Sequence, residues 1–441
     1  MNDVAIIGGG LPGLAAARTL RNAGVRCTLF EASDQLGGRA RSQHFGDITV
    51  DNGFQLLNSW YPSLKELLSN GEYAALNQCN FESGFQTHTS QGQVFIGDPV
   101  RTPRLLGELL SKNSRSAMSF RDIMGLRKWF GSELSHRSSL EMRKISEKRR
   151  AKDSKVCESL DRSGVTRQMR TAAADPAMRA FLLDTDGETS AITAKWVFAT
   201  LLRGAPTVPA QGMGDVANLL GRNTGVITET NARVTALKTN PGNSTESAGV
   251  TLHFGEHDRT ETFRYVVLAL PQKMEAELLD RPVLPARGME TFWFVSDEPI
   301  GKRPVITVDG TGRTPVASVA ELSAAAPSYA PGRHLIQGTV AFGGSQRALQ
   351  PGAIPNEVEM RRYMGEILDV PTSGWELVTR QRITDVFPVL TPERAAHSAE
   401  EDLVVDGGVI LAGAQHATPS IDGALRSGQR AAQKVIEFVG S

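Results

Sequence analysis

Three glycines near the start of the chain have the spacing that a dinucleotide phosphate requires. Gly8, Gly10 and Gly13 form a G-x-G-x-x-G pattern, which follows the apolar residues 4–7 and opens an expected helix that includes 14–22. The first glycine allows a tight turn, the second lets the backbone approach a pyrophosphate, and the third lets helix and strand pack closely. Free N–H groups at the helix start then face the phosphates. The pattern predicts a dinucleotide site.

An acidic residue stands where a ribose would be bound. Glu31 follows a second apolar run, 25–30, and lies 18 residues beyond Gly13. A carboxylate there can accept hydrogen bonds from both ribose hydroxyls of an adenosine. It disfavours a 2′-phosphate and therefore NADP, whereas NAD and FAD both remain open at this point.

The next motif favours FAD. Residues 36–42 read L-G-G-R-x-x-S, and with them the chain resembles the flavoprotein superfamily of flavin amine oxidases, protoporphyrinogen oxidase, phytoene and carotenoid desaturases, hydroxysqualene dehydroxylase and the Rab GDP-dissociation inhibitors. The resemblance implies that Gly38 and Arg39 lie along the pyrophosphate, with the arginine able to pair with it. It also implies FAD as the cofactor.

Further blocks along the chain carry the same resemblance. Residues 50–57 resemble the turn that meets the flavin ring, and their D-x-G-x-Q form is closer to the desaturases and dehydroxylases than to amine oxidases. Residues 231–237 resemble the segment that meets adenine, and 413–428 resemble the closing flavin motif. The FAD contacts implied by these blocks are Gly53, Phe54, Val234, Gly413, Ile421, Gly423 and Ala424, with Val234 at the adenine.

No Ser–His–Asp set or pair of carboxylates is evident, and the flavin is expected to carry the chemistry. Gln55 and His416 are weak catalytic candidates, because both fall in flavin motifs. His416 could transfer protons near the flavin. The alternative, which we favour, is a ring that faces solvent or bonds to the backbone.

The chain also departs from the superfamily. Ala414 stands where the closing motif usually has an acid, so either Gln415 takes over or the flavin is held less tightly. The last quarter of the chain has no cysteine, so the flavin is expected to be non-covalent. The lysine that amine and polyamine oxidases carry near residues 288–297 is missing, which argues against amine oxidation.

The order of these motifs predicts an α/β protein with a discontinuous, Rossmann-like FAD-binding domain formed by 1–60, 205–275 and 395–441. Residues 61–204 and 276–394 are expected to form a mixed α+β substrate domain. The second of these inserts would supply an antiparallel sheet and the first would supply helices. We interpret the aromatic run 292–294 as core strand rather than as a cage for substrate.

Composition excludes several classes of function. Lys+Arg and Asp+Glu both number 48, so bulk electrostatics argue against nucleic-acid binding. Three cysteines without C-x-x-C spacing predict neither a metal site nor a disulfide framework. No apolar run could span a bilayer, and the N-terminus does not read as a signal peptide, so we expect a cytoplasmic protein.

One segment is strongly basic. Residues 101–170 contain 18 Lys/Arg against 8 Asp/Glu, with helices expected over 104–110, 120–134 and 138–157. Either these helices are simply solvated, or they make a peripheral contact with an anionic membrane at its inner face.

Together these features predict an FAD-dependent oxidoreductase that dehydrogenates an apolar small molecule in a desaturase-like reaction, with an isoprenoid as the candidate class. The alternatives are a flavin amine oxidase or protoporphyrinogen oxidase-like enzyme, and a non-catalytic binding module like the GDP-dissociation inhibitors. The sequence predicts neither the electron acceptor nor the oligomeric state.

Overall fold

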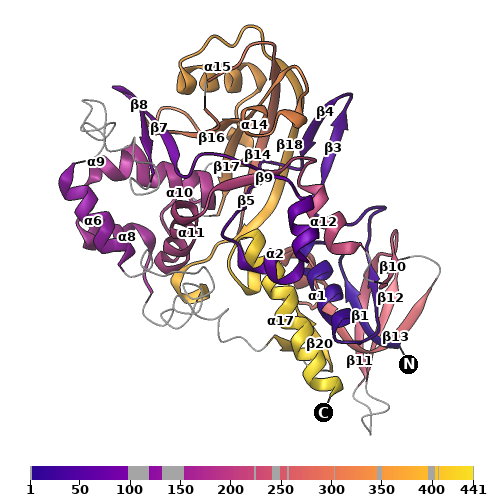
Figure 1. The fold of residues 1–441 in the computed structure, drawn as a ribbon. Coiled ribbons are helices and arrows are strands. Elements are labelled where there is room, and N and C mark those ends of the chain that lie inside the picture. The colour runs from indigo at the N-terminus through magenta and orange to yellow at the C-terminus, as the bar shows by residue number, and fades with distance from the viewer. Residues whose placement is uncertain are drawn as a thin grey trace.

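The computed structural model (Figure 1) contains two large sheets and a group of helices. It describes residues 2–97, 119–131, 153–222, 225–240, 249–255, 258–301, 303–344, 350–395, 403–405 and 407–440. The predicted helix over 104–110 lies outside these residues.

The first sheet is parallel at its centre, as the buried apolar runs predict. Strands run in the order β10 (Ile227–Glu229), β2 (Cys27–Phe30), β1 (Asn2–Ile7), β13 (Thr260–Leu268), β12 (Gly249–Phe254) and β11 (Val234–Asn240). β20 (Val409–Leu411) pairs with β13 in parallel and with β19 (Val404–Val405) in antiparallel fashion. β10, β2, β1 and β13 are parallel to their neighbours in this series, whereas β12 and β11 form an antiparallel extension.

The two faces of β1 are buried against different partners. Val4 and Ile6 belong to a core shared with α1 (Leu11–Asn22), α12 (Gly214–Gly221) and α17 (Ile421–Val439). Ala5 and Ile7 belong to a second core, in which residues of β2, β12, β13 and β20 take part. This alternation follows from the two-residue period of a strand. Because both faces of β1 are buried, consecutive residues of this strand are all apolar from Val4 to Ile7.

The second sheet is almost entirely antiparallel, which confirms the predicted antiparallel sheet. Its order is β18 (Glu376–Pro388), β14 (Ala286–Ser296), β17 (His334–Gly343), β16 (Val316–Glu321), β15 (Ile306–Asp309), β7 (Phe85–Thr89) and β8 (Gly92–Ile96). β7 and β8 come from the first insert, which was expected to supply helices alone. β7 pairs with β15 in parallel, and β8 closes a hairpin at the edge. The domain boundaries themselves stay a prediction.

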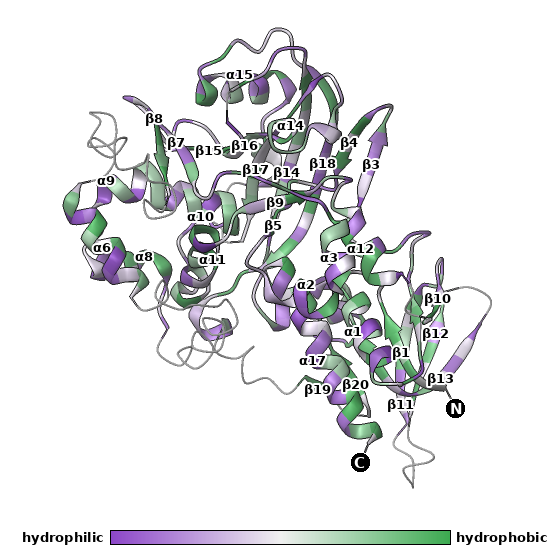
Figure 2. Cartoon of the chain, viewed as in Figure 1, coloured by the Kyte–Doolittle hydropathy of each residue, from purple (hydrophilic) through white to green (hydrophobic). Residues whose placement is uncertain are grey.

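The first insert contributes most of the remaining helices, several of which gather beside the second sheet (Figure 1). They are α2 (Pro62–Leu67), α3 (Asn70–Ala75), α6 (Phe120–Phe130), α8 (Val156–Ser163), α9 (Arg167–Met169), α10 (Asp175–Leu182) and α11 (Ala191–Arg203). Residues from α6, α8, α10 and α11 share one apolar core. Figure 2 shows how hydrophobic most of α11 is.

The helices predicted in the basic segment are confirmed only in part. α6 begins after Ser119, whose side chain forms a capping box with Asp122, and it ends at Phe130. The helix predicted over 120–134 is wrong at Gly131, which is not helical, and residues 132–134 and 138–152 lie outside the described residues. The prediction of helix through 157 is wrong for 153–155, because Lys155 pairs with Ser190 as an isolated bridge and α8 starts only at Val156.

Smaller elements complete the described structure. β3 (Ser42–Phe45) and β4 (Ile48–Asp51) form a hairpin, and β9 (Pro206–Pro209) lies between β5 (Leu57–Asn58) and β6 (Gln78–Asn80). α13 (Gln272–Leu278) follows β13, α14 (Leu322–Ala325) follows β16, and α15 (Glu357–Leu368) packs on the second sheet. Within the described part of the chain, no helix is both long enough and apolar enough to cross a membrane.

Candidate functional site

One cavity of about 780 Å³ reaches from the β1–α1 turn to the helices α10 and α11. Of the residues predicted to bind the cofactor, Gly8, Gly10, Glu31, Gly38, Arg39, Phe54, Val234, Gly413, Ile421 and Ala424 line it. Gly13, Gly53 and Gly423 do not line it. Motifs far apart in the sequence therefore meet at one cavity, whereas their individual contacts with FAD stay predictions.

The glycines of the first motif differ in what surrounds them. A Cβ on Gly13 would lie 1.9 Å from the carbonyl oxygen of Gly8, and a Cβ on Gly8, whose φ is +103°, would lie 2.5 Å from that of Ala269. At Gly10 the nearest heavy atom would be 3.7 Å away. Gly8 and Gly13 are therefore needed for packing, whereas Gly10 leaves room for a phosphate group to approach the backbone. α1 also has no acidic side chain in its first turn, which suits an anion.

The carboxylate of Glu31 already accepts more hydrogen bonds within the protein than the sequence indicates. One carboxylate oxygen accepts the Gly9 N–H at 2.8 Å, and the other accepts the Ser33 N–H at 2.9 Å and its hydroxyl at 2.7 Å. A carboxylate has about four acceptor positions. Glu31 therefore organises the loop around the glycine turn and keeps only part of its capacity for a ribose.

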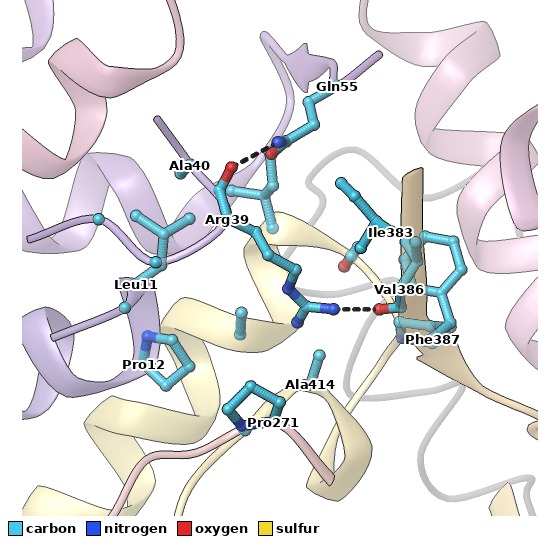
Figure 3. A pocket seen from close by; sticks show the side chains of 18 of the residues that line it. Leu11, Pro12, Arg39, Ala40, Gln55, Pro271, Ile383, Val386, Phe387 and Ala414 are labelled. Carbon is cyan, nitrogen blue, oxygen red and sulfur yellow. Dashed lines mark hydrogen bonds between the residues drawn. The ribbon is translucent and has the colours of Figure 1, made fainter. Parts of the chain in front are cut away.

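Arg39 carries a positive charge into the middle of the cavity. Figure 3 shows its guanidinium extending towards β18, where one nitrogen donates to the carbonyl oxygens of Asp385 at 2.7 Å and Val386 at 2.6 Å. Burial lowers the pKa of this guanidinium, and the charge of Asp385 partly opposes that shift. A largely desolvated cation on the cavity wall fits the pyrophosphate of FAD.

Gln55 locks a turn. Its side-chain nitrogen donates to the carbonyl oxygens of Arg39 at 2.7 Å and Asn52 at 2.8 Å, so it has no amide proton left for a substrate (Figure 3). The neighbouring Gly53 has a φ of +76°, and its N–H donates to Gln381 at 2.8 Å. Gln55 lines the cavity but holds the backbone of the two flavin motifs together, so the geometry gives no support to a catalytic role.

The closing motif presents its backbone to the cavity. A Cβ on Gly423 would lie 1.9 Å from the carbonyl oxygen of Thr418, so only glycine permits this entry into α17. Ser420 caps the helix by accepting the Gly423 N–H, and the Gly413 N–H donates to Ser427 at 2.7 Å. These contacts fix a loop whose Gly413, Ala414 and Ile421 face the cavity.

His416 lies away from both the cavity wall and the solvent. Its ring is buried and does not line the cavity. Nε2 lies 2.9 and 3.0 Å from the two carboxylate oxygens of Glu275 on α13. Glu275 lies 141 positions away in the chain, where no sequence signal connects the two.

Gln415 shares the same carboxylate. Its side-chain nitrogen donates to Glu275 at 2.8 Å and to the Leu270 carbonyl oxygen at 3.0 Å. Both amide protons are thus used inside the protein, so only the side-chain oxygen of Gln415 is left to accept a hydrogen bond in place of the missing acid. Glu275, which no sequence motif marks, is a buried acid that joins Gln415 to His416 from a different helix.

The far end of the cavity is built differently. It is lined by Leu57, Tyr61, Phe181, Leu183, Trp196, Val197 and Leu201, with Asn58 and Thr200 as further polar members. None of these described residues is charged. By contrast Phe292, Trp293 and Phe294 are fully buried in β14, which confirms that they are core strand. No cysteine is among the described residues that line the cavity, in keeping with a non-covalent flavin.

Comparisons with known proteins agree with this arrangement. Among solved structures the fold resembles cyclohexylamine oxidase from Brevibacterium oxydans (15% identity, 100% of this chain and 99% of that one, TM-score 0.67). It also resembles an oxidoreductase from Methanosarcina mazei (19% identity, 100% of both chains, TM-score 0.68). At these identities the likeness shows the fold alone.

The relatives found by sequence match over short stretches. A hydroxysqualene dehydroxylase from Zymomonas mobilis is 46% identical over 70 residues, which are 15% of this chain and 17% of that protein. Human lysine-specific histone demethylase 2 is 48% identical over 57 residues, 13% of this chain and 7% of that protein. The chain thus covers less than a fifth of either relative.

A family model reaches much further. The model described as flavin containing amine oxidoreductase matches residues 11–436, a range that takes in the second sheet, all strands of the first sheet except β1, and most of the residues that line the cavity. The chain belongs to the family of flavin-containing amine oxidoreductases.

Proposed function

We propose that this protein is an FAD-dependent oxidoreductase that dehydrogenates an apolar small molecule in a desaturase-like reaction, with an isoprenoid as the class of substrate. The observation that carries the proposal is the uncharged end of the cavity between α10, α11 and the segment 56–61. The transfer of an apolar molecule from water into such a site is favourable. An ammonium ion would lose its hydration there, and no carboxylate at this end would compensate for the loss.

Family membership and the cavity both support FAD. Bound FAD supplies the redox chemistry by accepting a hydride equivalent from the substrate. The protein's part is to bind and orient: Gly10 and the start of α1 receive phosphates, Arg39 balances their charge, and Gln55 holds the turn beside them. Phe181, Leu183 and Val197 exclude water from the uncharged end.

The desaturase-like reading has two further supports. The match to hydroxysqualene dehydroxylase brings a protein whose name refers to an isoprenoid substrate. Met289, which lines the cavity, lies in the stretch 288–297 that contains no lysine. A non-catalytic module is a weaker candidate, because the glycine turn, Arg39 and the closing loop all converge on one cavity.

Anaerobic reduction of the flavin tests this proposal. The FAD-loaded protein would be mixed with an isoprenoid hydrocarbon or alcohol, with cyclohexylamine, or with protoporphyrinogen, and the oxidised flavin absorbance followed. We expect bleaching with an isoprenoid and none with the amine. Bleaching by the amine or by protoporphyrinogen alone would contradict the desaturase-like assignment and favour the corresponding oxidase.

We also propose that α6 makes the peripheral membrane contact expected for the basic segment. Phe120 is 78% exposed and Met124 49% exposed, and both share the helix with exposed Arg121, Arg127 and Lys128. Apolar side chains beside cations are typical of helices that lie in an anionic lipid surface. α6 contacts α11, so the contact would lie near the uncharged end of the cavity.

Vesicle sedimentation tests the membrane contact. Vesicles of phosphatidylcholine with phosphatidylserine should bind the protein, and binding should fall as salt rises, because each cation contributes roughly 1 kcal/mol near an anionic surface. Phe120→Ser with Met124→Ser should weaken it. Val358→Ser, at a residue 70% exposed on α15, is the matched control and should have no effect. Equal loss in the control, or none in either variant, would overturn this role for α6.

A further inference from the structure

Tyr61 joins the cofactor cradle to the uncharged end of the cavity. It immediately precedes α2 and its N–H donates to the Asn58 carbonyl oxygen at 3.0 Å. The next turn is held to α17, because the Ser63 N–H donates to Asp422 at 2.9 Å. The ring of Tyr61 stacks on the ring of Trp196 from α11, with centroids 6.2 Å apart and planes 3° from parallel. The ring is therefore fixed from both sides of the cavity.

The polar groups at this end are not equally satisfied. Asn58 donates to the Thr200 carbonyl oxygen and accepts the Trp60 N–H, and the Thr200 hydroxyl donates to the Trp196 carbonyl oxygen. The Tyr61 hydroxyl has no hydrogen-bond partner among the described residues. The indole N–H of Trp196 has none either, but that atom is sealed from solvent. The Tyr61 hydroxyl therefore combines an unused donor with a place on the cavity wall, whereas the N–H of Trp196, a second lining residue, is inaccessible.

The Tyr61 hydroxyl also keeps its proton. Burial raises its pKa, and the nearby charge of Asp422 raises it further. The group is therefore a neutral donor throughout the range in which the protein would work. A polar group left unpaired in apolar surroundings costs free energy, so a ligand that offers an oxygen here gains an advantage over one that does not.

We propose that Tyr61 is a substrate-binding residue that donates a hydrogen bond to one oxygen, a hydroxyl or carbonyl, on an otherwise apolar substrate. This inference rests on the proposed function, because it takes the uncharged end of the cavity as the substrate site. It narrows the substrate class from any apolar molecule to one with a single oxygen function, held by the hydroxyl while the rest of the molecule packs on Phe181, Val197 and Leu201.

Two probes that differ only in a hydroxyl test the proposal. Octanol and octane would be titrated into the FAD-loaded protein, with the flavin absorbance and tryptophan fluorescence as readouts of binding. The affinity of each probe is first corrected for its partition from water into an alkane. After this correction we expect the wild-type protein to prefer octanol to octane by about tenfold, the value of one good neutral hydrogen bond. Tyr61→Phe should abolish that preference and leave octane binding unchanged.

A tyrosine elsewhere provides the matched control. Tyr265 does not line the cavity, and its hydroxyl lies 3.5 Å from the Phe438 carbonyl oxygen, so Tyr265→Phe removes a hydroxyl without touching the site. It should keep the preference for octanol. If Tyr61→Phe keeps that preference too, the anchor is wrong while the apolar site stands. If neither probe binds the wild-type protein, the uncharged substrate site is wrong and the anchor falls with it.

Discussion

The two ends of the cavity differ in whether main-chain groups or side chains form their surface. At the predicted dinucleotide end, Gly8, Gly10 and Gly413 bring main-chain groups to the cavity surface, and Arg39 adds a charge. At the other end only side chains are available, and the residues that form it are aromatic or aliphatic. A backbone site demands glycine at fixed spacing, whereas an apolar wall accepts many sequences. We therefore expect the first end to select a class of cofactor and the second end to select a substrate.

Glycine substitutions should have the largest effects and separate packing from binding. Gly13→Ala places a Cβ 1.9 Å from a backbone oxygen and should destabilise the first sheet as well as remove FAD. Gly10→Ala meets nothing closer than 3.7 Å, so it should fold normally yet bind FAD at least about tenfold more weakly, because the methyl group occupies the approach of the phosphates. Thermal unfolding and FAD titration of the apoprotein measure both. Normal FAD affinity in Gly10→Ala would show that no phosphate of FAD lies against this turn.

Charge at the dinucleotide end should come next in size. Arg39→Met keeps the length of the side chain but removes hydrogen bonds to a charged group, which are worth about 1.5–3 kcal/mol, or roughly ten- to a hundredfold in FAD affinity. Arg39→Lys should recover part of the loss. Arg380→Met, which removes a partner of Glu290 away from the cavity, is the control and should bind FAD normally. Equal affinity in Arg39→Met and the wild type would show that Arg39 serves only the β18 backbone.

A charge introduced at the uncharged end should spare the cofactor and change the ligand. Val197→Asp places a carboxylate on the wall formed by α11, where Val197 is only half-buried. FAD content should be unchanged, octanol affinity should fall about tenfold because polar and charged groups disfavour apolar ligands, and octylamine should bind better than before. Loss of FAD in this variant would mean that the two ends are not independent.

The smallest effect is expected at the closing loop. Ala414 lines the cavity and Glu275 does not, so Ala414→Asp adds a carboxylate acceptor at the cavity wall. We expect a change of about two- to threefold in FAD affinity, the scale of one weak hydrogen bond, or a shift in flavin reduction potential. An unchanged affinity and potential would show that the closing loop holds FAD without an acid at this position.

The sequence predicted the two ends to very different depths. Gly8, Gly10, Glu31 and Arg39 could be identified because phosphate and ribose recognition needs particular residues at particular spacings. The apolar runs that became β1 and β2 are typical of a parallel sheet that is buried on both faces, whereas the order of its strands was not predicted.

The uncharged end could not be predicted, because its residues meet only in three dimensions. Tyr61 and Trp196 lie far apart in the chain, and neither belongs to a motif. The partner of His416 was missed for the same reason, since in the sequence Glu275 cannot be distinguished from the other acidic residues of helical segments. The strands β7 and β8 were missed because their polar alternation, Phe85–Thr89 and Gly92–Ile96, lacks the buried run that marked the first sheet.

We propose that one cavity holds FAD at its glycine end and an apolar substrate at its helical end. The most direct measurement is a visible spectrum of the purified protein, combined with identification of the flavin released on denaturation and of any compound extracted by apolar solvent. We expect a yellow protein that releases FAD without proteolysis and yields an apolar, oxygen-bearing compound. A colourless protein that cannot be reconstituted with FAD would show that the cavity is not a flavin site.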